Sequence, residues 1–545
     1  MTTTATATGE HFDFVIVGGG TAGCVLADRL TANGRYRVLM LEAGGRDNGF
    51  WIPIPAGFSK LLTGARYNWR FETEAEDNTL NRRIVVPRGK GLGGSSLING
   101  MIFVRGQPQD YDGWAQSGAR GWAWDDVLPY FKKLERYDNG QQELADAGDL
   151  RGRTGPMSVE QVKLRPAIAE AFIAAGQQAG YPRNEDYNGR DQEGFGYYQV
   201  TQKNGKRWSA ADAYLRDAEK RPNLVVRCHA HVTRLVLEGQ RVTGVEYRLG
   251  DRHYCVTAQR EVVMAAGAVQ SPQILELSGI GDPAHLRGIG IEVSHALTGV
   301  GNNYRDHFCT RMNWRVKLPV TLNEQARGPR LALAVAQYFA TRTGILTLGT
   351  GLVHAFIKTR PELVSPDIQY FFMHASYANA ADRTLDRQPG MTIGVAQLRP
   401  DSVGSIHAKS ADPDMMPAIK PNFLSASGDA ECLIEGMRAA RRIITQPAMA
   451  AYHDHEMSPG DRVQSDAEWL DFARSNGQTI YHPIGTCKMG VDPQAVVDPA
   501  LKTHRLDGLR IVDASVMPLM VSANTEAAVL MIAEKAADLI LRDAQ

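Results

Sequence analysis

A run of glycines near the start of the chain has the residue types and spacing needed to bind a phosphate-bearing ligand. Residues 18–23 read Gly-Gly-Gly-Thr-Ala-Gly, which fits the pattern G-x-G-x-x-G. In this pattern Gly18 permits a tight turn, Gly20 lets the backbone approach a pyrophosphate, and Gly23 lets a helix pack closely against a strand. Free N–H groups at the start of that helix favour anions. The pattern predicts dinucleotide binding, with a purely structural turn as the alternative, and does not separate FAD from NAD.

Two strands and a helix must surround this motif if it is to hold a dinucleotide. Residues 12–17 form a short apolar run typical of a buried strand, residues 21–30 have helical spacing, and residues 37–42 form a second apolar strand. Together these elements predict a βαβ unit. Glu42 ends the second strand, where a carboxylate can accept hydrogen bonds from the ribose hydroxyls of a dinucleotide.

The rest of the chain has mixed periodicity, which predicts both helices and antiparallel strands. Residues 225–237 and 242–247 alternate like antiparallel strands, with Glu238 and Gly239 as turn residues between them. The C-terminal residues 526–541 have one apolar face and predict an amphipathic helix. Three further elements are expected, namely helices at residues 122–136 and 166–179 and a strand at residues 261–265.

The composition is that of a globular protein with more than one packed region. The chain has 545 residues, of which 43% are hydrophobic and 22% charged, and this length is too great for one hydrophobic core. Its 60 basic and 60 acidic residues give a net charge of zero. We therefore expect no nucleic-acid partner and no polybasic membrane patch, and the balance argues against a strongly ionic substrate.

Three features of the sequence indicate the cellular compartment. They are the cysteines, the N-terminal residues and the apolar run near the middle of the chain. Six scattered cysteines form no CxxC pair, which fits free thiols in a reducing compartment. Residues 1–11 lack the features of a secretory signal and are expected to form a disordered tail. The apolar run at residues 331–340 is too short to span a bilayer, so we expect a buried helix there. These features predict a cytoplasmic protein without a transmembrane segment, and peripheral contact with the inner membrane stays open.

Four later motifs resemble, in order, the signatures of the glucose–methanol–choline (GMC) oxidoreductase family. Residues 89–100 read Gly-Lys-Gly-Leu-Gly-Gly-Ser-Ser-Leu-Ile-Asn-Gly. Residues 267–272 read Gly-Ala-Val-Gln-Ser-Pro, and the motif continues to Ser-Gly-Ile-Gly at 278–281. Residues 481–487 and 513–515 resemble the C-terminal motifs of the family. The resemblance covers nearly the whole chain.

The resemblance implies an α/β fold with two discontinuous domains. The FAD-binding domain, which is Rossmann-like and of the GMC type, would comprise residues 12–160, 221–310 and 485–545. An inserted α+β substrate-binding domain built on an antiparallel sheet would comprise residues 161–220 and 311–484. Val232 would lie on the strand that offers backbone groups to the adenine.

The resemblance also implies which residues contact FAD. They are Gly18, Gly20, Thr21, Ala22, Gly23, Glu42, Ala43, Arg88, Gly91, Gly93, Gly94, Ser95, Asn99, Gly100, Met101, Ile102, Val232, Ala266, Gly267, Tyr481, Asp513, Ala514, Asn524 and Thr525. Some relatives attach FAD covalently through a histidine near the glycine-serine loop. Here Leu97 and Asn99 occupy that neighbourhood and no histidine is present, so we expect non-covalent FAD.

The catalytic residues are expected to be His482 and Asn524. Alcohol oxidation needs a hydroxyl proton removed as hydride leaves the α-carbon, and imidazole suits that task because it titrates near neutral pH. His482 occupies the position of the family's catalytic base. Asn524 occupies the position, His or Asn in the family, that hydrogen-bonds the alcohol oxygen, and its alternative role is a helix N-cap. The histidine pairs 229/231 and 453/455 lack a neighbouring carboxylate or cysteine cluster, so no metal site is expected.

The chain departs from the family pattern at Glu526, because many relatives read Asn-x-Asn-Ala-Pro where this chain reads Asn-Thr-Glu-Ala-Ala at 524–528. A carboxylate in the first turn favours the helix dipole. The sharper hypothesis is that its charge lowers the potential of the flavin. The helix start itself can stabilise the reduced flavin anion.

The implied reaction is FAD-dependent oxidation of a primary alcohol to an aldehyde, with O2, a quinone or a carrier protein as electron acceptor. Ile480 is expected near the flavin face, where it can hinder oxygen, which slightly favours a dehydrogenase over an oxidase. Three alternatives stay open: a non-redox lyase of the same family, a flavin-binding protein without catalysis, and an NAD-dependent dehydrogenase. The substrate is not determined, and choline is among the candidates. The substrate pocket is expected to include Phe371, Phe372, His374, Tyr377 and Tyr481.

Overall fold

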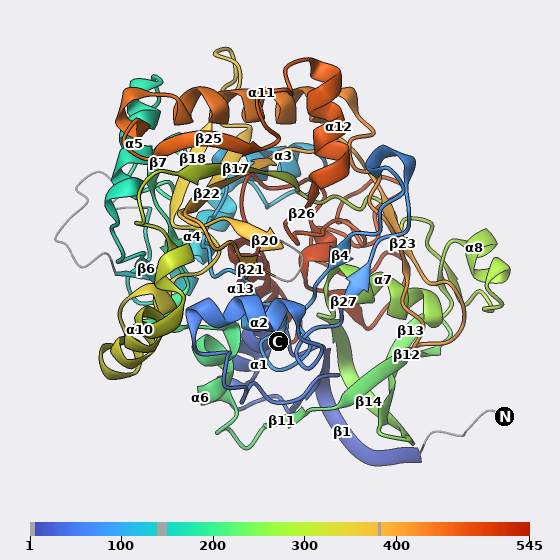
Figure 1. Ribbon diagram of the computed structural model, residues 1–545. Coiled ribbons are helices and arrows are strands. Elements are labelled where there is room, and N and C mark those ends of the chain that lie inside the picture. The colour runs from blue at the N-terminus through green and yellow to red at the C-terminus, as the bar shows by residue number, and fades with distance from the viewer. Residues whose placement is uncertain (1–5, 139–149, 380–382) are drawn as a thin grey trace.

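Two large sheets organise the computed structural model, which describes residues 6–138, 150–379 and 383–545 (Figure 1). The first sheet has the strand order β11-β2-β1-β14-β13-β12, with β27 paired to β14. Its bounds are β1 Thr6–Val17, β2 Val38–Leu41, β11 Leu224–Arg227, β12 Ala230–Glu238, β13 Arg241–Leu249, β14 Arg252–Met264 and β27 Leu509–Ile511. The pairs among β11, β2, β1, β14 and β27 are parallel, whereas β12 and β13 form an antiparallel extension of the sheet.

The βαβ unit expected at the start of the chain is present as β1, α1 (Thr21–Thr31) and β2. The side chains of residues 14–17 and of the whole of β2 are buried, as their apolar sequences predict. Helix α1 packs against the C-terminal helix α13 (Glu526–Asp543), and Arg29 forms an ion pair with buried Glu534 at 2.7 Å. Helices from the first and last parts of the sequence therefore pack together beside the first sheet.

Two expectations for this sheet need correction. Strand β1 begins at Thr6 and pairs with β14 from there, so residues 6–11 are not a disordered tail; residues 1–5 lie outside the described part. The segment 225–237 is two strands instead of one, because His229 adopts a positive φ of 59° that breaks it. Strand β11 then joins β2 in parallel, and only β12 forms the expected hairpin with β13.

The second sheet is antiparallel, in the order β25-β17-β22-β19-β18-β7, with β26 paired to β17. Its bounds are β7 Gly194–Tyr197, β17 Phe308–Val316, β18 Val353–Ile357, β19 Ile368–Met373, β22 Gly390–Gln397, β25 His453–Ser458 and β26 Gln478–Thr479. All eight residues of the central strand β22 are buried, because α11 (Ser427–Ile444) packs on it. Gly436 allows this close approach, since a Cβ there would lie 2.7 Å from the Ile368 side chain.

The strands of the two sheets can be compared with the two domain ranges expected from the sequence, which stay a prediction. The first-sheet strands from Phe12 onward fall in the ranges expected for FAD binding, and most second-sheet strands fall in those expected for the substrate. Strand β17 begins at Phe308, before the boundary at 311. A three-stranded sheet of β5 (Glu135–Asp138), β6 (Met157–Gln161) and β8 (Gln199–Val200) crosses the boundary at 160. Helices α4 (Trp124–Leu134) and α5 (Ala167–Gln178) lie where the sequence predicts helices.

The apolar run at 331–340 is helical but not buried. It belongs to α10 (Gly328–Thr341), in which Tyr338 alone is buried, so the expectation of a buried helix is wrong. None of the described helices is long and apolar enough to cross a membrane. All six cysteines are free thiols.

Candidate active site

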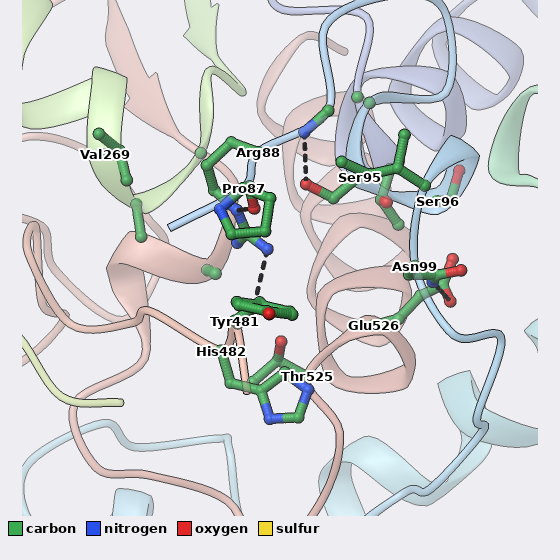
Figure 2. Close-up of a pocket in the computed structure, with 18 of the residues that line it drawn as sticks. Pro87, Arg88, Ser95, Ser96, Asn99, Val269, Tyr481, His482, Thr525 and Glu526 are labelled. Atoms are coloured by element: carbon green, nitrogen blue, oxygen red, sulfur yellow. Dashed lines mark hydrogen bonds between the residues drawn. The ribbon is translucent and has the colours of Figure 1, made fainter. Parts of the chain in front are cut away.

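A deep pocket is lined by strands of both sheets and by the loops between them (Figure 2). One end is formed by the turn between β1 and α1, the end of β2 and the start of α7 (Gly267–Leu277). The other end is formed by β17, β19 and β22 of the second sheet. The loop at residues 87–102 and the segments at 480–482 and 524–526 lie between these ends.

The glycines of the first motif allow backbone segments to meet at the first end of the pocket. Gly18 has a φ of 106°, and a Cβ there would lie 2.5 Å from the Ala265 carbonyl oxygen. A Cβ on Gly23 would lie 2.0 Å from the Gly18 carbonyl oxygen. Gly20 borders the pocket, and a Cβ there would approach protein atoms only at 3.9 Å, so its backbone is open to a ligand. These are the three separate glycine roles that the motif requires.

Glu42, which directly follows β2, stabilises the turn between β1 and α1 through hydrogen bonds of its carboxylate. Its Oε2 accepts a hydrogen bond from Gly19 N at 2.8 Å, and its Oε1 accepts one from Gly44 N at 2.7 Å. Burial raises the pKa of this carboxyl. Since each carboxylate oxygen has more than one lone pair, Glu42 can hold the turn and still accept a ribose hydroxyl in the pocket that it lines.

Most residues that the sequence assigned to FAD line this one pocket. They are Gly18, Gly20, Thr21, Ala22, Glu42, Ala43, Arg88, Gly94, Ser95, Asn99, Gly100, Met101, Ile102, Val232, Ala266, Gly267, Tyr481, Asp513, Ala514, Asn524 and Thr525. Gly23, Gly91 and Gly93 do not line it. Gly93 instead donates its N–H to Gly19 O at 2.7 Å, which joins the second glycine loop to the first.

Asn99 and Glu526 form a polar cluster where the loop meets the start of α13 (Figure 2). Asn99 Nδ2 donates to Glu526 Oε2 at 2.6 Å, and buried Arg207 donates to Asn99 Oδ1 at 2.7 Å. Glu526 Oε1 is buried and has no hydrogen-bond partner within the described residues. Burial raises the pKa of Glu526 to about 7, against the opposing effects of Asn99 and Arg207. An unpartnered carboxyl oxygen in a pocket with a glycine cradle fits a flavin dinucleotide, whose ring edge carries polar atoms.

His482 and Asn524 lie together in the middle of the pocket. His482 Nε2 is 3.2 Å from Asn524 Nδ2, and Asn524 Oδ1 accepts from Gln369 Nε2 at 3.2 Å. Thr525 is the N-cap of α13, so Asn524 is not the cap that the sequence allowed as an alternative. Arg88 Nη2 donates to the Tyr481 carbonyl oxygen at 2.7 Å and so holds the residue before the histidine.

His307 is a neighbour of His482 that the sequence did not reveal. The antiparallel pairing of Phe308 in β17 with Thr479 in β26 brings the residues next to these strands together. As a result His307 Nδ1 lies 2.9 Å from His482 Nδ1, and His307 Nε2 lies 2.9 Å from the Leu398 carbonyl oxygen. The sequence contained no signal for this contact, because the two histidines are 175 residues apart.

Hydrogen-bonding rules fix the protons on these two rings. A carbonyl oxygen only accepts, so His307 Nε2 carries a hydrogen. Burial lowers the pKa of His307 to about 4, which leaves the ring neutral and its Nδ1 an acceptor. His482 Nδ1–H therefore donates to His307, and His482 Nε2 keeps its lone pair. Burial, with the nearby His307 and Arg88, also lowers the pKa of His482 well below 6.5, so this ring is a neutral base.

The other end of the pocket is lined by alternate residues of β19. Phe371 and Met373 line it together with Tyr377 and Ile480, whereas Phe372 and His374 do not. Successive side chains of a strand point to opposite faces, which explains why Phe372 stacks on Phe172 instead, with ring centroids 4.2 Å apart. The expectation that Phe372 and His374 line the substrate pocket is therefore wrong.

One group of possible metal ligands lies outside the pocket among the described residues. Glu276, His285 and His407 approach one another to within 4.8 Å. Glu276 already accepts from His407 Nδ1 at 2.7 Å and from Ala408 N at 2.6 Å. The sequence did not indicate this cluster, and its internal hydrogen bonds account for its geometry.

Comparison with known proteins places the chain in a family. Residues 12–309 and 400–533 match the N- and C-terminal parts of the GMC oxidoreductase family. An alcohol dehydrogenase (acceptor) from Pseudomonas putida is 40% identical over 537 residues, covering 97% of this chain and 96% of the relative. An oxygen-dependent choline dehydrogenase from Klebsiella pneumoniae is 42% identical over 537 residues, covering 97% of this chain and 96% of the relative.

Solved structures give the same result for the fold. The crystal structure of pyridoxine 4-oxidase from Mesorbium loti superposes with a TM-score of 0.87 at 31% identity, covering 97% of this chain and 99% of that chain. The fold and enzyme class expected from the sequence are thereby confirmed. The chain belongs to the GMC oxidoreductase family and is an FAD-dependent oxidoreductase.

Proposed function

We propose that the protein oxidises a primary alcohol to an aldehyde, with His482 as the base and Asn524 as the group that holds the alcohol oxygen. The observation that carries the proposal is the 3.2 Å pairing of His482 Nε2 with the Asn524 amide in a pocket lined by the dinucleotide motif. The names of the relatives, which include alcohol and choline dehydrogenases and an aryl-alcohol oxidase, support an alcohol substrate.

Asn524 and His482 have different roles in the proposed reaction. Asn524 Nδ2 donates a hydrogen bond to the alcohol oxygen and holds the hydroxyl against His482. The lone pair of His482 Nε2 accepts the hydroxyl proton, because its pKa is lowered and the ring is neutral at neutral pH. FAD would supply the hydride acceptor at this site, and a second acceptor would take up the electrons afterwards. Gly18, Gly20 and Glu42 would hold its dinucleotide part, and Asn99, Thr525 and Glu526 would border its ring.

The charges at the second-sheet end of the pocket favour an uncharged alcohol over choline. Arg311 and Phe371 are both paired with Gly394 of β22 at this end, and Arg383 and Tyr377 line the same pocket. Of the described residues that line the whole pocket, the acidic ones are Glu42, Asp513 and Glu526, which lie at the end or middle assigned to the cofactor. A quaternary ammonium group would share the pocket with these two guanidinium groups, without a carboxylate at the second-sheet end to compensate them. We therefore expect neutral aliphatic or aromatic primary alcohols as substrates.

FAD is proposed to bind without a covalent bond, and the electron acceptor is proposed to be a quinone or carrier in preference to O2. Leu97 and Ile98 of the loop pack in an apolar cluster with Leu61 and offer no nucleophile to the flavin. Ile480 lines the pocket two residues before His482, and we expect its side chain to restrict access of oxygen to the reacting centre. Precipitation of the holoenzyme with acid should release the yellow flavin into the supernatant, and flavin retained in the pellet would contradict non-covalent binding.

An anaerobic titration tests the main proposal. The visible spectrum of the purified holoenzyme is recorded while a panel of neutral primary alcohols and choline is added, and bleaching of the flavin bands by the neutral alcohols is expected. In His482→Ala the flavin bands should bleach about 10²–10⁴-fold more slowly than in the wild type. Before alcohol is added, the variant should have the same flavin spectrum as the wild type. His374→Ala is the matched control, because His374 is also buried but lies off the pocket.

The outcomes of this titration separate the alternatives. Slow recolouring in air, with fast recolouring by a quinone, supports a dehydrogenase, whereas fast recolouring in air indicates an oxidase. Flavin that no alcohol bleaches would contradict alcohol oxidation, and bleaching by choline alone would contradict the substrate class.

A further inference from the structure

Helix α10 is covered by the rest of the protein along very little of its surface. Tyr338 is buried and Ala334 is partly buried, and the other residues of Gly328–Thr341 are exposed. Leu333 is 71% exposed and Phe339 is 46% exposed. Helices of this length are marginal in water and usually gain stability by packing an apolar face. In Figure 1 α10 projects at the edge of the molecule, which leaves it free to contact a partner.

A nearby loop extends the exposed apolar surface of this helix. Phe50 is 63% exposed and stacks on Phe339, with ring centroids 6.3 Å apart, and the exposed Trp51 packs edge-on against Phe50. The Tyr338 hydroxyl ties the helix to the same loop through the Pro53 carbonyl oxygen at 3.4 Å. We call this surface the α10 patch, made up of Phe50, Trp51, Leu331, Leu333, Val335 and Phe339.

The two segments that form the α10 patch carry basic residues and no acidic ones. No Asp or Glu occurs at residues 49–70 or 325–360, although the chain as a whole has 60 acidic and 60 basic residues. Lys60, Arg66 and Arg330 are exposed on these segments. The Arg342 guanidinium lies over the rings of Tyr338 and Phe339, at 4.9 and 5.3 Å from their centroids. Apolar and aromatic side chains with cations around them are the combination that binds an anionic lipid surface.

We propose that the α10 patch docks the enzyme on an anionic membrane surface. The apolar side chains enter the boundary between headgroups and acyl chains, and Arg330 and Arg342 at the two ends of α10 contact lipid phosphates. A second copy of the chain fits this surface less well. A two-fold contact would set the same cations of both copies against each other with no carboxylate from either segment to compensate. The proposal does not depend on which alcohol is the substrate.

Sedimentation with vesicles tests the proposal on the holoenzyme. The wild type should sediment with vesicles that contain phosphatidylglycerol and phosphatidylcholine, and should stay in solution with vesicles of phosphatidylcholine alone. The double variant Leu333→Glu, Phe339→Glu should lose at least tenfold in partition to the anionic vesicles. Both substituted side chains are exposed, so the fold should tolerate the change, and an unaltered flavin spectrum checks this.

A matched control separates the α10 patch from exposed apolar surface in general. Val491 is 69% exposed, close to the value for Leu333, and lies outside the patch. Val491→Glu should sediment with anionic vesicles like the wild type. A second variant, Arg330→Gln with Arg342→Gln, should weaken binding to anionic vesicles and reduce its sensitivity to salt. The proposal is overturned if the wild type does not sediment with anionic vesicles, if the double Glu variant binds like the wild type, or if light scattering shows a dimer that this variant dissociates.

Discussion

His307 Nδ1 lies 2.9 Å from His482 Nδ1, and this contact determines which nitrogen of His482 can act as a base. The Leu398 carbonyl oxygen requires a hydrogen on His307 Nε2, which makes His307 Nδ1 an acceptor and His482 Nδ1 a donor. The lone pair of His482 is therefore on Nε2, the atom that faces Asn524. The carbonyl of Leu398, the residue after β22, thus sets the tautomer of the proposed base through one intervening ring.

His307 is accordingly a positioning residue, and its removal should impair catalysis without loss of flavin. We expect His307→Ala to lower kcat/KM by about 10- to 100-fold, because His482 is then free to adopt the other tautomer and ring orientation. The acid limb of the pH profile should also move to higher pH, since His307 is one of the groups that lower the pKa of His482. Steady-state kinetics over a pH series measures both effects.

His374→Ala serves as the control for this experiment. His374 is also buried, its pKa is likewise lowered to about 4, and it does not line the pocket. A drop in kcat/KM of the same size in both variants, with unmoved acid limbs, would show that His307 matters only for packing.

The pH dependence of the wild type follows from the lowered pKa of His482. A proton on Nε2 removes the base, so activity requires the neutral ring. Burial lowers the pKa of His482 well below 6.5. At pH 6.5, therefore, fewer than half of the protein molecules carry a protonated His482 ring. We expect kcat/KM to stay near its maximum at pH 6.5 and to fall only in more acid solution. An acid limb centred above pH 6.5 in the free enzyme would argue against His482 as the titrating base.

Glu526 should make the flavin potential depend on pH near neutrality. Burial raises its pKa to about 7, so the carboxyl is ionised above that pH and neutral below it. A negative charge beside the flavin disfavours the reduced anion, so Glu526→Gln should raise the midpoint potential at pH 8 by on the order of 30 mV, about 1.4 kcal/mol for a two-electron couple. At pH 6 the two proteins should nearly agree. Potentiometric titration with a reference dye measures the difference, and equal potentials at both pH values would rule out this role for Glu526.

Gly23 should be essential for cofactor binding through the close approach of α1 to the preceding turn. In Gly23→Ala the new methyl carbon would lie 2.0 Å from the Gly18 carbonyl oxygen, so the turn must shift. We expect a loss of stability of about 1–3 kcal/mol and a much lower flavin content after purification. Gly288→Ala in α8 (Pro283–Gly288) is the control, because nothing lies within 4 Å of a Cβ there. Full flavin occupancy in Gly23→Ala would contradict the role assigned to this glycine.

Sequence reasoning succeeded where structure depends on residues close together in the chain. The turn at Gly18, helix α1 and helix α13 follow from short-range spacing of glycine and apolar residues, and the structure has all three. The same applies to the motifs that identified the family, since each is a continuous run of residues. The assignment of most cofactor residues to one pocket rests on this resemblance.

The tertiary structure alone decided the features that depend on long-range pairing and on burial. The pairing of β17 with β26 places His307 beside His482, and no local pattern in the sequence encodes that register. Strand alternation in β19 turns Phe371 toward the pocket and Phe372 away from it, which requires knowing where the pocket lies. Helix α10 has the apolar sequence of a core helix yet lies exposed. Local spacing specifies the type of an element, whereas the other elements of the fold determine which of its faces they cover.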